Sequence, residues 1–249
     1  MDLNFKRVCI IGSPRSGSQY VSELIRLSVM RASGKAVYNL AEPFTDNQLY
    51  QLVLDKDNYL KNQNINKLPP IEERIENTIS VLKNANLNQQ IVIKLFPYKY
   101  LVPHLTKILD TLYNADFVFL ILRRKNVEDQ LLSFAVAETT NSWTGINGEG
   151  ILNSEITISP ETLKKLKITH KYLDYFEYIL NKFTLKHLPN IYYETAVEDL
   201  YDLLQIPINT REMTLQKQIP SDPYQFITNA EEVKQFIETL IDGNQLHKT

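Results

Sequence analysis

The sequence predicts an α/β fold with three layers, in which a central parallel sheet is flanked by helices on both faces. Short runs of β-branched and apolar residues alternate along the chain with longer segments whose apolar residues recur at helical spacing. This alternation is typical of parallel sheets, because a crossover helix connects each strand to the next. No internal repeat, low-complexity tract or shift in composition marks a linker, so residues 1–249 are expected to form a single domain.

Five segments have the composition expected of strands. They are short and rich in apolar and β-branched residues. The most apolar of them, Phe117 to Leu122, has the composition of a central strand that is covered on both faces. The expected strands are residues 6–11, 36–40, 91–96, 117–122 and 190–194.

Helices are expected between these strands, where apolar residues recur on one helical face. Asn126 stands where a side-chain N-cap would begin one of them. The expected helices begin at residue 17 and at Pro70, span 101–113 and 127–140, and fill most of the chain from Leu163 to about Leu240.

Composition narrows the class of partner. Hydrophobic residues make up 43% of the chain, charged residues 22%, and the net charge is −2, as is typical of soluble globular proteins. The basic excess needed for duplex binding is missing, so no nucleic-acid partner is expected. No apolar run approaches the roughly eighteen residues of a membrane span, so no membrane association is expected. The single cysteine, Cys9, favours a cytoplasmic location without internal disulfides, and four scattered histidines predict no metal site.

Polar groups occur at four places where the expected strands end. In open parallel sheets the carboxyl ends of the strands meet at one edge, and ligands bind there. A shared ligand site at this edge is therefore expected. The groups are the loop 12–18, Glu42, Lys94 and the pair Arg123-Arg124.

The loop Gly12-Ser-Pro-Arg-Ser-Gly-Ser18 joins an expected strand to an expected helix. Such a loop offers backbone N–H groups and the positive end of a helix dipole to a phosphate. Its two glycines have the spacing of the Walker pattern, and the predicted three-layer sandwich is P-loop-like. Ser18 and Gln19 replace the lysine and the Mg²⁺-binding hydroxyl of that pattern, which disfavours an ATPase or GTPase. Arg15 supplies the positive charge of the loop instead.

Two other interpretations of this loop stay open. Cys9 and Arg15 have the Cys-x5-Arg spacing of cysteine-dependent phosphatases. However, Ile10 and Ile11 extend a buried strand after the cysteine, and burial would raise the pKa of the thiol and keep it protonated. The second interpretation is a glycine turn that only joins strand to helix.

The loop and three further segments resemble motifs of the PAPS-dependent sulfotransferases, in the family's order along the chain. PAPS is 3′-phosphoadenosine 5′-phosphosulfate. Residues 12–20 resemble the loop that binds its 5′-phosphosulfate, and RRKNVEDQLLSF at 123–134 resembles the motif that binds its 3′-phosphate. Ile191-Tyr-Tyr-Glu194 is similar to a late-strand YE pattern, and Leu40-Ala-Glu-Pro43 to the EP segment of carbohydrate-type and related bacterial and viral members.

The resemblance implies roles for the matching residues. Glu42 would be the general base for an acceptor hydroxyl, and Arg15 would stabilise charge on the leaving 5′-phosphate. Arg124, preferred over Arg123, would hold the 3′-phosphate with Ser133, although their separation is one residue longer than is usual. The reaction would use PAPS as co-substrate and no metal. The implied PAPS-binding residues are Arg15, Ser16, Gly17, Ser18, Tyr20, Arg124, Ser133, Tyr193 and Gln19, which stands where the family has a hydroxyl.

Two other functions stay open beside a sulfotransferase. One is a catalytically silent module that binds PAP (the desulfated nucleotide) or another nucleotide, and the other is a diverged P-loop kinase-like phosphotransferase. The acceptor would be a sugar, a lipid or a small metabolite, and residues 44–70 and 141–158 are expected to line its site. Trp143 belongs to a glycine-bearing segment that is either a lid or a plain surface connection. Lys94 either reaches the sheet edge or points into the site, and the oligomeric state is left open.

Overall fold

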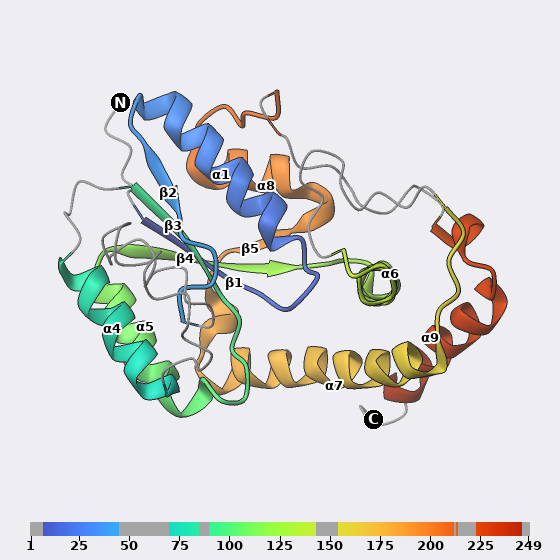
Figure 1. Cartoon of the computed structure of the whole chain (residues 1–249). Helices are drawn as coiled ribbons and strands as arrows, with labels where there is room; N and C mark the ends of the chain where they lie inside the picture. Colours follow the sequence, from blue (N-terminus) through green and yellow to red (C-terminus); the bar gives the residue numbers. More distant parts are fainter. Residues whose placement is uncertain are drawn as a thin grey trace, which may run out of the picture.

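The computed structural model of the chain describes residues 7–44, 70–84, 90–142, 154–211, 213 and 223–245. Within these ranges it contains one five-stranded sheet of order β2-β3-β1-β4-β5, in which all paired strands run parallel (Figure 1). The α/β fold with a central parallel sheet between helical layers is thereby confirmed. The strands are β1 (Arg7–Ile11), β2 (Val37–Asn39), β3 (Gln90–Leu95), β4 (Phe117–Arg123) and β5 (Asn190–Tyr192).

The central strand β1 determines where the glycine loop lies. β3 and β4 pair with its two sides, and every residue of β1 is buried. Its side chains alternate between the two helical layers, with Val8 and Ile10 in one apolar core and Cys9 and Ile11 in the other. Because β1 ends in the middle of the sheet, the loop that follows it lies at the centre of the carboxyl edge.

Helices cover both faces of the sheet (Figure 1). One layer packs against Val8 and Ile10, and the other packs against Cys9 and Ile11. No helix in the described ranges combines the length and apolar composition that crossing a membrane requires. The first layer holds α1 (Ser18–Ser33) and α8 (Ala196–Leu204), and the second holds α4 (Ile71–Asn84), α5 (Leu105–Asn114, after the 3-10 turn Val102–His104) and α7 (Pro160–Lys182).

A third group of helices lies beyond the carboxyl edge of the sheet (Figure 1). Here α6 (Val127–Thr140) packs with α7 and α9 (Ala230–Gln245) around a separate apolar core. The predicted cap of α6 is confirmed, because Asn126 Oδ1 accepts a hydrogen bond from the backbone N–H of Asp129 at 3.2 Å. The sequence did not predict the isolated parallel bridge that follows, between Ile156 and Ile227.

The last strand is shorter than predicted. It was expected to include residues 190–194, but β5 ends at Tyr192 and the chain continues as a 3-10 turn, η3 (Tyr193–Thr195). The carboxylate of Asp199 accepts hydrogen bonds from the backbone N–H of Tyr192 at 2.8 Å and from the Thr195 hydroxyl at 3.0 Å. These bonds bend the chain out of the sheet, so Tyr193 is a turn residue and not a strand residue.

The buried core of β3 provides a test of this fold. Ile93 is completely buried, so Ile93→Ala is expected to lower the free energy of unfolding by about 2–5 kcal/mol. Tyr113→Ala is the control on α5, where the side chain is 73% exposed, and it should change stability by less than about 0.5 kcal/mol. Urea unfolding followed by circular dichroism measures both. Equal stability of the two variants would contradict the assigned core.

Candidate functional site

The loop between β1 and α1 has the backbone geometry of an anion site. Gly17 is the N-cap of α1, with φ at +88°, and no side chain caps the first turn of the helix. Arg15 also has a positive φ, +62°, and the backbone N–H of Ser16 closes the turn onto the carbonyl of Ser13 at 3.2 Å. The first N–H groups of α1 and the positive end of its dipole are therefore directed at the loop.

Gln130 of α6 holds the loop in place. Its Nε2 donates to Ser13 Oγ at 2.9 Å and to the carbonyl of Pro14 at 2.7 Å, and its side chain is buried. Sequence reasoning missed this residue. The only available signal was an amide side chain that precedes two leucines in an expected helix, and such a pattern does not distinguish a buried amide from an exposed one.

Arg15 and Ser133, two of the predicted site residues, are in direct contact. The guanidinium donates from Nε and Nη2 to Ser133 Oγ at 3.1 and 2.8 Å. Burial is the main cause that lowers the pKa of Arg15 to about 10, and the like charge of Arg124 lowers it further, while Tyr193 acts in the opposite direction. The charge of Arg15 is therefore held in an environment that disfavours a cation.

Arg124 lies on the ring of Tyr193, with its guanidinium carbon 4.3 Å from the ring centroid. Burial lowers its pKa, and Tyr193 together with the carboxylates of Glu194 and Asp129 partly opposes that effect. Its Nε is buried and has no hydrogen-bond partner among the described residues. Within the described residues, Arg124 makes no hydrogen bond to Ser133. The two members of the predicted pair therefore lie beside the same loop without a hydrogen bond between them.

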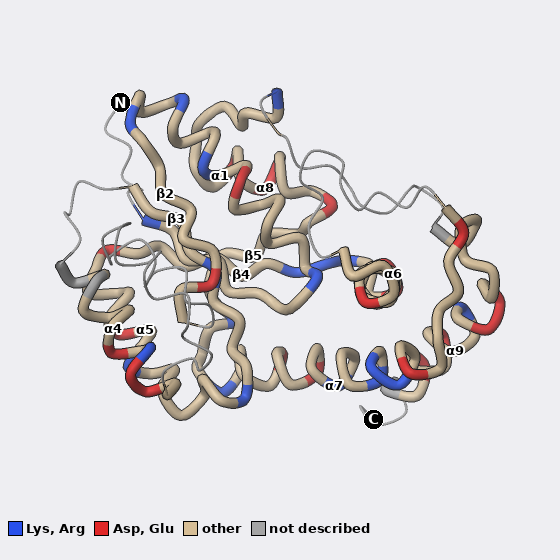
Figure 2. The backbone as a smooth tube through the Cα atoms, in the orientation of Figure 1, with Lys and Arg blue, Asp and Glu red and all other residues tan. Residues whose placement is uncertain are grey.

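The neighbouring arginine is directed elsewhere. Arg123 donates from Nε to Asn190 Oδ1 at 2.9 Å and forms an ion pair with Glu177 of α7. These contacts hold the side chain of Arg123 against β5 and α7. The charge of Arg124, in contrast, lowers the pKa of Arg15. Figure 2 shows basic positions gathered where β4 ends beside α6. The structure thus places Arg124, and not Arg123, beside the loop.

Tyr193 closes one side of this arrangement. Its ring contacts Tyr20 of α1 edge-on, with centroids 5.6 Å apart. The ring also covers Gly17 so closely that a Cβ on Gly17 would lie 2.6 Å from Tyr193 Cε2 and 2.9 Å from Cγ. Gly17 is therefore required for two reasons, its positive φ and the close approach of the ring.

A second cluster joins Glu42, Lys94 and Gln19. Lys94 is buried near the end of β3, and its Nζ donates to Gln19 Oε1 at 3.0 Å and lies 3.7 Å from Glu42 Oε1. The backbone N–H of Lys94 donates to the carbonyl of Ala41 at 2.6 Å, which aligns the segment after β2 beside β3. Of the two orientations that the sequence left open, Lys94 therefore takes the one that points into the site.

Cys9 is separated from this site. Its side chain is completely buried in the apolar core below β1, and burial raises the pKa of the thiol well above its ordinary value. A protonated, enclosed thiol is not a nucleophile. The phosphatase interpretation is thus disfavoured by the position of the residue that it needs.

Parts of the expected site lie outside the described residues, including 45–69 and 143–153, with Trp143 and its neighbouring glycines. The described residues contain no group of three or more histidine, cysteine, aspartate or glutamate side chains that could hold a metal ion.

The sequence matches none of the known protein-family models and none of the curated proteins with which it was compared, so the chemistry of this site rests on its own residues.

Two alanine substitutions separate the requirements at Gly17. Gly34→Ala, at φ +66° with no atom within 4 Å of the new Cβ, measures the backbone penalty alone and should cost about 1–2 kcal/mol of stability. Gly17→Ala should cost more, because it adds the collision with Tyr193. Removing the ring in a Gly17→Ala, Tyr193→Ala double variant should recover part of that excess. Equal losses at Gly17 and Gly34, measured by urea unfolding, would contradict the packing of Tyr193 on the loop.

Proposed function

We propose that this chain is a PAPS-dependent sulfotransferase, which transfers the sulfuryl group of PAPS to a hydroxyl of a sugar, lipid or small-metabolite acceptor. The observation that carries the proposal is the pair of half-buried arginines, Arg15 and Arg124, at the glycine loop. The proposal includes a cytoplasmic location, which the single cysteine favours.

A doubly phosphorylated nucleotide suits this pair for electrostatic reasons. Two partly buried cations repel each other, and burial disfavours both charges. A ligand with two anionic groups would relieve both penalties and would form charge-assisted hydrogen bonds. The buried atoms Ser16 Oγ and Arg124 Nε, which lack partners within the described residues, are suitable donors for phosphate oxygens.

The two phosphates would be divided between two parts of the site. Arg15, the loop backbone and the N-terminus of α1 would bind the 5′-phosphosulfate. Arg124 and Ser133 would bind the 3′-phosphate. Ser133 Oγ accepts hydrogen bonds from Arg15, which leaves its own hydroxyl proton for donation. Tyr193 would position Arg124 and contribute an aromatic wall beside the adenine.

The proposed reaction needs a base and a stabilised leaving group. The acceptor oxygen forms a bond to sulfur, and the bond between sulfur and the 5′-phosphate oxygen breaks with its electron pair staying on the phosphate. The acceptor proton passes to the carboxylate of Glu42, and the products are a sulfate ester and PAP. Arg15 would stabilise the growing phosphate charge, and the ion pair with Lys94 would orient Glu42 toward the site.

Nucleotide selectivity tests the proposal without knowledge of the acceptor. PAP is expected to bind without Mg²⁺ at low-micromolar or tighter affinity, and ADP at least about tenfold more weakly, because a charge-assisted hydrogen bond contributes about 1.5–3 kcal/mol. Arg124→Ala should remove most of this difference. Arg123→Ala is the matched control and should leave the difference between PAP and ADP unchanged, because Arg123 pairs with Glu177. Calorimetry that finds equal affinities for PAP and ADP would exclude a 3′-phosphate site, and Mg²⁺-dependent ATP binding would favour the kinase-like alternative.

Catalysis is tested separately from binding. Glu42→Gln should retain PAP affinity and reduce the slow hydrolysis or acceptor transfer of sulfate from ³⁵S-labelled PAPS by about 100-fold or more, because general-base catalysis contributes roughly that much. Cys9→Ser should leave the rate nearly unchanged, because the thiol is enclosed in the core. PAP binding without any sulfate release from the wild-type protein would identify the chain as the catalytically silent module instead.

A further inference from the structure

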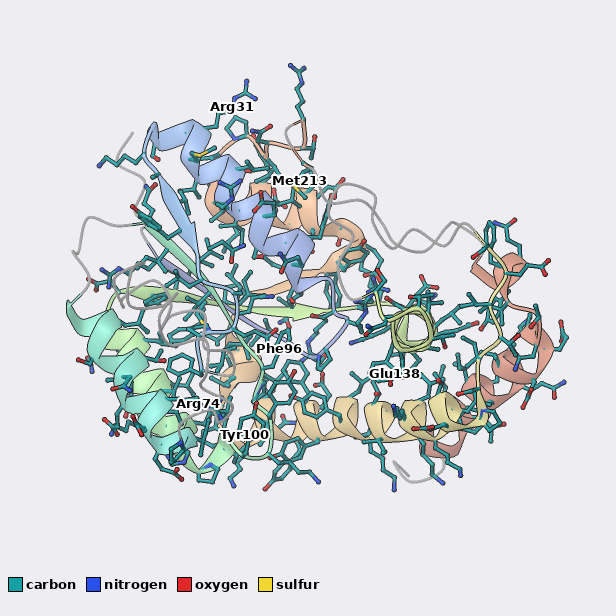
Figure 3. All side chains as sticks on the ribbon, in the orientation of Figure 1. Arg31, Arg74, Phe96, Tyr100, Glu138 and Met213 are labelled. Atoms are coloured by element: carbon teal, nitrogen blue, oxygen red, sulfur yellow. The ribbon has the colours of Figure 1, made fainter. Side chains whose placement is uncertain are left out.

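A row of aromatic side chains leads away from the candidate site toward α7. Phe96, at the end of β3, lies against the glycine loop, since a Cβ on Gly12 would be 3.5 Å from its ring. Phe96 contacts Tyr98 edge-on, with centroids 6.0 Å apart. Figure 3 shows Phe96 between the sheet and α7, with Tyr100 near the end of that helix.

The row continues through five tyrosines, which we call the tyrosine row: Tyr98, Tyr100, Tyr172, Tyr175 and Tyr178. The ring of Tyr98 stacks on that of Tyr100, with centroids 5.5 Å apart, and contacts the ring of Tyr172, with centroids 5.6 Å apart. On α7, the ring of Tyr172 contacts that of Tyr175, and the ring of Tyr175 stacks on that of Tyr178. The ring centroids are 6.1 Å apart in both pairs. The inner rings are half-buried, while Tyr100 and Tyr178 are 47% and 54% exposed. The rings therefore connect the site to the surface.

The inner end of the row is close to the proposed base. The hydroxyl oxygen of Tyr172 is buried and has no hydrogen-bond partner among the described residues. Burial and its neighbours Tyr98, Tyr175 and Tyr100 raise the pKa of Tyr172, and the charge of Glu42 adds to that effect. A buried hydroxyl without a partner is costly, and a polar ligand that reaches Glu42 would offer it one.

The outer part of the row carries positive charge. Lys99 Nζ lies 5.6 Å from the centroid of Tyr175, and Lys182 Nζ lies 5.8 Å from that of Tyr178. Lys164 and Lys171 are exposed on the same α7 face as Tyr175 and Tyr178, at helical spacing from them. Asp174 lies at the same helical spacing, so the four lysines outnumber one carboxylate here. In a chain whose net charge is −2, this surface is locally basic and suits an anionic partner.

We propose that the tyrosine row binds an acidic oligosaccharide and delivers its end to Glu42, so that the acceptor is a hydroxyl of an anionic sugar chain. The proposal rests on the proposed function and narrows its acceptor class. Tyrosine rings offer flat apolar faces for the C–H faces of sugars and hydroxyls for their polar groups. The lysines at the outer rings then select chains that carry carboxylates or sulfates.

A membrane surface fits these observations less well. Interfacial segments bury large apolar side chains in the lipid, whereas Ile168 is the only strongly exposed aliphatic side chain on the described part of α7. The rings contact one another in a series whose inner end is the half-buried Tyr172, and the charge of Glu42 raises the pKa of this tyrosine. Because the hydroxyl of Tyr172 at the inner end of the row is buried, the end of a linear polymer fits this arrangement better than a flat membrane does.

The test uses the full chain and three probes: a decamer of galacturonic acid, neutral maltodecaose, and vesicles of phosphatidylserine and phosphatidylcholine. The acidic decamer is expected to bind at least about tenfold more tightly than the neutral one at low salt. Tyr100→Ala and Tyr178→Ala should each weaken its binding about three- to tenfold. The double variant Lys99→Ala, Lys182→Ala should weaken binding of the acidic decamer only. Tyr201→Ala on α8, where the ring is 53% exposed on the other face of the sheet, is the matched control and should have no effect.

PAP affinity, measured on the same variants, separates the two proposals. Unchanged PAP binding with a raised KM for sulfation of the decamer supports the tyrosine row as the acceptor site. PAP binding without any decamer binding overturns this inference and leaves the nucleotide site intact. Vesicle binding that depends on Tyr100 and Tyr178, without decamer binding, overturns it in favour of a membrane surface. Failure of PAP to bind overturns the proposed function, and with it the acceptor role, even if the decamer binds.

Discussion

The repulsion between two partly buried arginine charges is the constraint on which the candidate site depends. Arg15 and Arg124 are both partly removed from water, which lowers the pKa of each, and the charge of Arg124 lowers the pKa of Arg15 further. The chain does not relax this strain by turning them outward. Instead Ser133 accepts two hydrogen bonds from Arg15, and the ring of Tyr193 lies against Arg124. A site built in this way is preorganised for an anion, because the free energy of holding the charges together is spent during folding and not during binding.

The helix α6 connects the glycine loop to α7. Its Gln130 fixes the glycine loop and its Ser133 holds Arg15, whereas Glu138, farther along, forms an ion pair with Lys165 of α7 (Figure 3). A partly exposed ion pair contributes little by itself, but α6 and α7 also share a buried apolar core. The part of the tyrosine row that lies on α7 is therefore held in a defined position relative to the loop, which a shared acceptor and nucleotide site would require.

The architecture was predictable from the sequence, because strand composition and helical spacing are local signals. Asn126, for example, was identified as a cap from its position alone. The placement of Lys94 was not, because one lysine in an apolar strand is compatible with two orientations. Gln130 was missed, and the pairing of Arg15 with Ser133 depends on the crossing of α6 over the loop, which no local pattern encodes. The predicted end of β5 lay two residues beyond the observed one, because tyrosine is common in strands. The chain turns there because of hydrogen bonds to Asp199, which lies outside the strand.

The most direct measurement of the central claim observes the two arginines themselves. In a protein labelled with ¹⁵N-arginine, the Nε–H signals of Arg15, Arg124 and Arg123, assigned by substitution, are followed during titration with PAP. The signals of Arg15 and Arg124 are expected to shift together and to saturate at the same PAP concentration, while the signal of Arg123, which is paired with Glu177, stays in place. Unshifted signals of Arg15 and Arg124 at saturating PAP, or the same shifts at equal concentrations of inorganic sulfate, would contradict it.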